Sequence, residues 1–263
     1  MVAYKDPDRR FQNGGRGKGP IGGHQSSGCG KDFEDEREGG LQRNRGKHVL
    51  QAMLVLGGMV MEKNNYCCST LFIDCDHPAV RDKSAELTDR IEEAREKAIR
   101  LFYFVKDGIR YNIYAPRATD AHFKASHVLA SKEGYCVQKA VLLVALARAA
   151  DIPARLRFAE IRSFLTAPEI VTRRGSNVFP YHGLADLYIN GRWVKATPTY
   201  DPEYCKKMCI APIHFDGQSD ALLPAFTEDG RPNVEYMLDR GFFEDLPIEE
   251  IRKASLSWKY MKS

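Results

Sequence analysis

The pattern of apolar and polar positions is most distinct at residues 136–150, CVQKAVLLVALARAA, where a nearly continuous apolar run has the length of a helix. A run of this kind predicts a helix that is buried on all sides. Polar residues at 131–135 precede it, and the sequence DIP at 151–153 ends it. The first residue of this helix is Cys136, a thiol whose role has to be decided from the rest of the chain.

Apolar residues at helical spacing also occur before this run and predict a helical region over residues 79–107. The positions that share one face are Ala94, Ala98, Leu101, Phe102 and Val105. The sequence DCDHPAV at 74–80 is typical of a helix start, with Asp76 as the cap and Pro78 in the first turn. Other segments with a recognisable pattern are a strand at 69–74, an extended segment at 108–114 and a short helix at 122–131.

After residue 153 the composition favours strands. The expected elements are strands at 154–161, 182–189 and 192–197 and a final helix at 247–260. Asn190-Gly191 separates the last two strands and is a strong hairpin signal. Helices therefore come first, then the buried helix, then an antiparallel sheet. This order predicts an α+β fold with segregated layers rather than alternating βαβ units.

The first 48 residues differ from the rest, because they hold 11 of the 21 glycines and almost no Leu, Ile or Val. Such a composition cannot bury enough apolar surface to offset its ordering entropy. We therefore expect a disordered Gly-rich tail over 1–64 and one domain over 65–263. The apolar run at 49–61 either docks on the domain as a short helix or is leader sequence upstream of a natural start at Met61.

Composition excludes several classes of function. The net charge is only +4, and no basic stripe with interleaved aromatic residues appears, so nucleic acid is not expected as a partner. The longest apolar run, 49–61, is too short to span a membrane, and no membrane partner is expected. Seven cysteines at irregular spacing, without a signal peptide, favour a reducing, cytoplasmic setting.

A cysteine at a helix N-terminus has a chemical use. The positive end of the helix dipole and the unpaired backbone N–H groups both stabilise a thiolate, so we expect a lowered pKa for Cys136. The alternative is that Cys136 is a small apolar residue of the core. A nucleophilic cysteine also needs a base within hydrogen-bond reach. Among the seven histidines, His182 differs by opening a strand and by preceding Gly183.

Two segments resemble the transglutaminase-like superfamily. They are GYCVQKAVLLVALARAADIPARLRFAEI and YHGLADLYINGRWVKATPTYD, and the resemblance extends over roughly 100–202. It implies a papain-like α+β core in which a cysteine-bearing helix packs on a sheet that carries a histidine and an acidic residue. It also implies that Cys136 is the nucleophile and His182 the base.

The third catalytic position departs from the family pattern, which has Asp before the final Pro-Thr. Here that position is Thr197, whose hydroxyl can fix the imidazole tautomer but supplies no charge. We rank Thr197 first as the orienting residue. Asp186, on the same face of the strand as His182, and Asp201, beyond the next strand, are the alternatives.

The oxyanion of an acyl-transfer intermediate needs donors besides the backbone N–H of Cys136, and Tyr135 or Gln138 could supply one. Lys139 is expected on a solvated helix face. Cys205, Cys209 and His214 lack the ligand spacing of a zinc site, so no metal or other cofactor is expected.

These features predict an enzyme that cleaves an amide or peptide bond through a thioester, with hydrolysis favoured over cross-linking. The expected partner is a peptide or amide substrate, together with an amine acceptor if the acyl group is transferred. The alternative is a binding or scaffold domain of the same fold whose triad has degenerated.

Overall fold

The structure is a computed structural model that describes residues 66–260, with side chains described as far as Ala254. The predicted tail at 1–64, including the apolar run at 49–61, lies outside the described residues. No helix within the described part is both long and apolar enough to cross a membrane.

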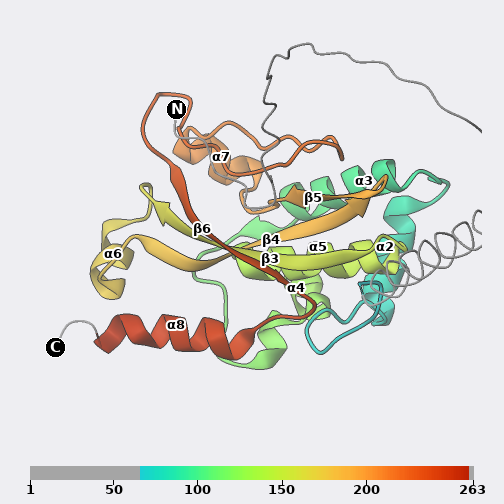
Figure 1. Cartoon of the computed structure of the whole chain (residues 1–263), viewed down its shortest axis with the longest axis horizontal. Coiled ribbons are helices and arrows are strands. Elements are labelled where there is room, and N and C mark those ends of the chain that lie inside the picture. Colours follow the sequence, from blue (N-terminus) through green and yellow to red (C-terminus); the bar gives the residue numbers. More distant parts are fainter. Residues whose placement is uncertain (1–65, 261–263) are drawn as a thin grey trace, which may run out of the picture. The chain divides into compact units, whose positions relative to one another are not determined.

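Helices dominate the first part of the domain and strands the second (Figure 1). The helical elements are α2 (Pro78–Thr88), α3 (Ala94–Gly108), the 3-10 helix η1 (Asp120–Phe123), α4 (Ala125–Ser131), α5 (Cys136–Ala149), α6 (Pro168–Arg174), α7 (Pro202–Met208) and α8 (Ile248–Tyr260). The strands are β1 (Arg110–Tyr111), β2 (Glu133–Gly134), β3 (Ala154–Ser163), β4 (Val178–Ile189), β5 (Arg192–Ala196) and β6 (Val234–Phe243).

The main sheet has four strands in the order β5-β4-β3-β6, and its paired neighbours are antiparallel. The hairpin between β4 and β5 turns at Asn190 and Gly191, whose φ angles of 49° and 89° are both left-handed. This is the backbone of a tight two-residue hairpin, and it confirms the predicted turn. A short parallel pair joins β1, which follows α3, to β2, which directly precedes α5 in the chain.

Helix α5 is the centre of the core. It packs on β4 and β3, while α2, α3 and α4 cover its other sides (Figure 1). Every residue from Val137 to Arg148 is buried, which explains why this helix has no polar face. The predicted α+β fold with segregated helix and sheet layers is confirmed.

Two expectations for the first helical region and the segment before it are wrong, whereas its helical pattern is confirmed and divided between two helices. The pattern at 79–107 forms two helices, α2 and α3, and the left-handed Arg90 lies in the turn between them. The cap of α2 is His77, whose Nδ1 accepts from the N–H of Ala79 at 3.3 Å, rather than Asp76. Residues 69–74 form turns instead of a strand, because their backbone groups bond locally, as from Thr70 N–H to the carbonyl of Ile73.

Candidate active site

Cys136 and His182 line the same pocket, which has a volume of about 270 Å³. Gly183 explains how the two elements that carry them approach so closely. A Cβ placed on Gly183 would lie 2.8 Å from the Cα of Val137 and 3.4 Å from the carbonyl oxygen of Cys136. Only glycine, which has no Cβ, lets β4 pass directly against the first turn of α5. Because His182 precedes Gly183, this approach brings the imidazole to the end of α5 that carries the Cys136 thiol.

The thiol of Cys136 begins α5, as expected, but its pKa is not lowered. Burial raises the pKa of the Cys136 thiol, and the backbone N–H of Gly183 and the charge of Arg117 offset this only in part. The expectation of a depressed pKa is therefore wrong for the resting site. Loss of water around the sulfur outweighs the stabilisation that a helix N-terminus offers a thiolate.

The imidazole of His182 is 2% exposed, and burial lowers its pKa to about 3. At neutral pH the ring is uncharged and can accept a proton. Together with the raised thiol pKa, this makes the resting site a neutral thiol–imidazole arrangement.

Thr197 is fully buried where β5 ends, but its hydroxyl makes no hydrogen bond to His182. Nε2 of His182 has no hydrogen-bond partner among the described residues. Tyr236 on β6 is a neighbour of both residues, and its ring centroid lies 6.1 Å from that of His182. Burial raises the pKa of the Tyr236 phenol to about 12, and a side-chain hydrogen bond with Thr197 offsets this rise in part. Sequence analysis missed Tyr236, although alternating Val234, Tyr236 and Leu238 could have indicated a strand.

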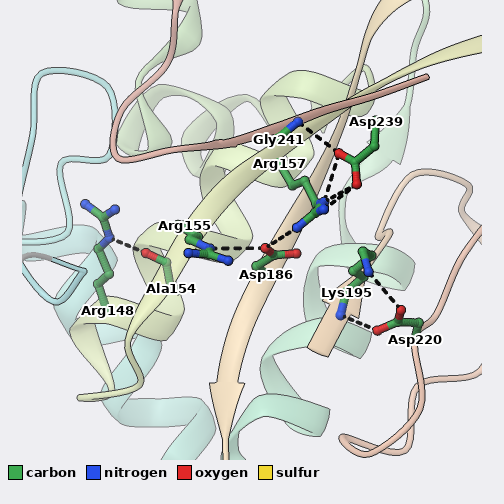
Figure 2. Close-up of polar contacts among 9 residues, drawn as sticks. All are labelled: Arg148, Ala154, Arg155, Arg157, Asp186, Lys195, Asp220, Asp239 and Gly241. Atoms are coloured by element: carbon green, nitrogen blue, oxygen red, sulfur yellow. Dashed lines mark hydrogen bonds and ion pairs between the residues drawn. The ribbon is translucent and has the colours of Figure 1, made fainter. Parts of the chain in front are cut away.

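The carboxylates of the two alternative residues, Asp186 and Asp201, form hydrogen bonds with other partners than His182. Figure 2 shows Asp186 between Arg155 and Arg157, and its Oδ2 lies 3.1 Å from a nitrogen of each. Asp201 caps α7, because its Oδ1 accepts from the N–H of Tyr204 at 2.8 Å, and its Oδ2 accepts from the N–H of Tyr111 at 2.6 Å. Neither carboxylate is hydrogen-bonded to His182 in the described structure, so neither is placed as its orienting group.

Gln138 is fully occupied by structural contacts. Its Nε2 donates to the carbonyls of Pro116 at 2.9 Å and His122 at 2.8 Å, and its Oε1 accepts from the N–H of Tyr135 at 3.1 Å. Both amide hydrogens are used in these contacts, so a role for Gln138 as an oxyanion donor, which stays a prediction, would require one of them to break. Tyr135 keeps its phenol protonated, since burial raises its pKa, and the Arg117 guanidinium lies 4.2 Å from its ring centroid.

The expectation of a solvated Lys139 is also wrong. Its side chain is fully buried, and its Nζ donates to the carbonyls of Lys106 at 3.1 Å and Ile109 at 2.6 Å. Lys139 therefore satisfies carbonyls at the C-terminal end of α3. Burial lowers its pKa to about 7.

Other residues of the pocket carried no catalytic signal in the sequence. They are mainly aromatic and aliphatic, and they include Thr199, whose buried Oγ1 has no hydrogen-bond partner in the described part of the chain. Within residues 66–254, no group of three or more His, Cys, Asp or Glu side chains could hold a metal ion.

Comparison with known proteins identifies a family. Residues 81–198 match the sequence profile of the transglutaminase-like superfamily, a range that includes Cys136, His182 and Thr197. No curated protein sequence matches the chain.

Three solved structures are similar to parts of the chain. A proposed cysteine protease from Cytophaga hutchinsonii is 19% identical, over 51% of this chain and 40% of that one, with a TM-score of 0.40. A proposed protease from Parabacteroides distasonis is 13% identical, over 45% and 23%, with a TM-score of 0.33. The periplasmic domain of TgpA from Pseudomonas aeruginosa is 18% identical, over 46% and 42%, with a TM-score of 0.34. The matched part thus spans less than half the length of each of these chains. The comparison that carries the family resemblance is therefore the profile match, in which residues 81–198 match the transglutaminase-like superfamily.

Proposed function

We propose that this protein cleaves an amide bond through a thioester on Cys136, as a cysteine hydrolase or acyltransferase. The observation that carries the proposal is the meeting of Cys136 and His182 in one pocket, with the N–H of Gly183 directed at the sulfur. A nucleophile next to a neutral base is the arrangement that acyl transfer requires.

The neutral resting pair defines the order of proton transfers. The sulfur of Cys136 attacks the carbonyl carbon while His182 takes the thiol proton. The imidazolium then gives that proton to the leaving nitrogen, the C–N bond breaks and a thioester remains. Water or an amine attacks the thioester, again with His182 as the base, and the C–S bond breaks to regenerate the thiol. The backbone N–H of Cys136, at the start of α5, is the first candidate donor to the oxyanion.

The substrate class in this proposal is a peptide or another amide, and water is favoured over an amine as the acceptor. We also propose that the protein acts in the cytoplasm without nucleic acid or membrane partners, which agrees with its balanced charge.

The proposal is tested by removing the nucleophile. Cys136→Ala and Cys136→Ser are expected to reduce turnover of peptide amides more than about 10³-fold while the unfolding midpoint stays near that of the wild type. Cys67→Ser is the matched control, because Cys67 is also partly exposed but lies outside the pocket. Turnover by purified Cys136→Ala at the wild-type rate would exclude the thioester route.

A scaffold function is the second candidate, and the unpartnered Nε2 of His182 beside Thr197 favours it. Reaction with a peptidyl vinyl sulfone distinguishes the two, because this electrophile needs an activated thiol. An enzyme is modified at Cys136, and His182→Ala slows that reaction strongly. In a scaffold, Cys136 reacts no faster than Cys67, and His182→Ala has no effect.

A further inference from the structure

The pocket that holds the Cys136 thiol has an aromatic wall. Tyr111, Tyr200 and Tyr204 all line it. Their ring centroids are 5.1 Å apart for Tyr111 and Tyr200, 4.8 Å for Tyr111 and Tyr204, and 4.7 Å for the stacked pair Tyr200 and Tyr204. Because each ring contacts the other two, the wall is rigid and presents ring surface to a ligand.

Aliphatic and aromatic side chains from other elements complete the lining. Ile161 comes from β3, Leu165 from the segment after it, Ile170 from α6 and Phe179 from β4. Ile161 and Ile170 are 5% and 7% exposed, so they form a fixed apolar surface at this site. The fold brings these residues together with Tyr111 from segments at least 50 residues later in the chain.

The side chains that line the interior of the pocket carry no charge, and the two arginines that act on Cys136 electrostatically, Arg117 and Arg174, are outside its lining. Its two permanently charged lining residues, Glu169 and Lys207, are both exposed. Inside, burial raises the pKa of Cys136 and lowers that of His182, so both are neutral at neutral pH. A charged side chain entering the pocket would lose its hydration without meeting a charged group in the interior lining, whereas an apolar one would gain by leaving water.

The volume limits what can enter. At about 270 Å³ the pocket is slightly below the range of about 300–1,000 Å³ typical of small-molecule sites. That space suits one large side chain beside the reacting amide rather than an extended ligand. The buried Oγ1 of Thr199 is available to contact a polar atom of the substrate backbone.

From these walls, this volume and this lack of interior charge, we infer that the pocket selects amide substrates with a bulky apolar side chain, branched aliphatic or aromatic, on the acyl side of the scissile bond. The inference rests on the proposed function. It predicts that the glutamine side chain is a poor acyl donor for this protein.

The test uses full-length protein and peptides with a fluorogenic amide leaving group, assayed with and without added amine. The two residues on the acyl side are varied among Leu, Phe, Ala, Gln, Asp and Lys. We expect kcat/KM for Leu or Phe to exceed that for Ala by at least about 10-fold and that for Asp or Lys by about 100-fold. Equal or better turnover of the Ala, Gln, Asp or Lys peptides overturns the inference and leaves the proposed function intact.

Leu165→Ala probes the pocket itself, with Leu222→Ala as the matched control. Both leucines are partly buried against the core, but only Leu165 lines the pocket. We expect Leu165→Ala to reduce the preference for Leu over Ala about 3–10-fold, in keeping with the loss of contact with the substrate side chain. Leu222→Ala should leave that preference unchanged. The same change in preference in both variants overturns the assignment of the pocket.

A binding measurement separates failure of the inference from failure of the proposed function. Saturation-transfer NMR with amidated dipeptides is applied to Cys136→Ala and to Cys136→Ala/Leu165→Ala. Suppose that no peptide is turned over, but Leu and Phe peptides bind Cys136→Ala at least about 10-fold more tightly than Asp and Lys peptides, and the added Leu165→Ala change reduces this preference. The apolar selectivity then stands and the proposed acyl chemistry fails. If binding shows no such order in that case, the apolar selectivity is overturned as well.

Discussion

Replacing Thr197 by Asp should restore the carboxylate that the family pattern has at this position. Thr197 is fully buried, and the His182 Nε2 has no hydrogen-bond partner in the described residues. The β4–β5 register pairs Ala185 with Ala196, which places residue 197 on the same face of the sheet as His182. A carboxylate at 197 would therefore favour the imidazolium form of His182.

The size of the effect follows from the charges. At an effective dielectric of about 20, two unit charges about 4 Å apart attract by roughly 4 kcal/mol, which is equivalent to about 3 pKa units. Desolvation of the new carboxylate reduces this, and a rise of about 1–3 units is usual for such pairs. Since the pKa of His182 is about 3 in the wild type, we expect roughly 4–6 in Thr197→Asp.

The assay is the pH dependence of kcat/KM, with tryptophan fluorescence recorded at each pH to show that the protein is folded. Activity requires neutral His182, so the acid limb of the profile reports its pKa in the free enzyme. For the wild type, the limb should lie near pH 3 or coincide with acid unfolding. For Thr197→Asp it should move upward to about pH 4–6.

Thr197→Asn is the control, because it matches the shape of Asp without the charge. The reasoning is refuted if Asp and Asn give the same acid limb, since the carboxylate would then not be in contact with His182. It is also refuted if the wild-type limb already lies at pH 6, which would mean that the ring is solvated or paired with another acid.

Three further predictions concern the packing around the site. Gly183→Ala should lower the free energy of unfolding in urea by about 1–3 kcal/mol and kcat/KM at least 10-fold, because the added Cβ would lie 2.8 Å from the Cα of Val137. An unchanged urea midpoint would contradict the close approach of β4 and α5. Burial lowers the pKa of Lys139 from 10.5 to about 7, so between these pH values the unfolded chain binds more protons than the folded one. The free energy of unfolding should therefore rise with pH in this range by up to about 1.4 kcal/mol per pH unit, and Lys139→Met should remove this rise. An identical pH dependence of stability in both proteins would show that Lys139 is charged when folded. Gln138→Met keeps the length of the side chain but not its hydrogen bonds to the carbonyls of Pro116 and His122, so it should lower the free energy of unfolding in urea by about 1–3 kcal/mol. No loss of stability would show that water replaces Gln138 at these two carbonyls.

The elements that sequence analysis predicted correctly are those with strong local signals. The helix that begins at Cys136 is one continuous apolar run, and the hairpin at Asn190-Gly191 depends on two residues with a left-handed backbone. The order of helices and strands was enough to give the α+β class. The resemblance to the transglutaminase-like superfamily selected Cys136 and His182, which the fold then placed in one pocket.

The features that sequence analysis did not predict depend on partners distant in the chain. Lys139 is buried because the carbonyls at the end of α3 need donors, and nothing in its neighbouring sequence reveals this. Gln138 bonds a loop that precedes it by 16 to 22 residues. The pKa of Cys136 depends on the burial that the surrounding fold creates, and helix position alone gives the opposite sign.

The position of Tyr236 on β6 has a consequence for the chain during its synthesis. A ribosome-bound chain that has reached residue 200 contains Cys136 and His182, but α7 and β6 have not yet been made. The pocket wall then lacks Tyr204, and the imidazole lacks its aromatic neighbour, Tyr236. Once such a chain has left the ribosome, fewer side chains shield the two reactive groups from water, so we expect their pKa values to lie closer to those of free cysteine and histidine. The nascent protein therefore has a more ordinary thiol than the finished one, and the environment that defines the site is complete only when β6 pairs with β3.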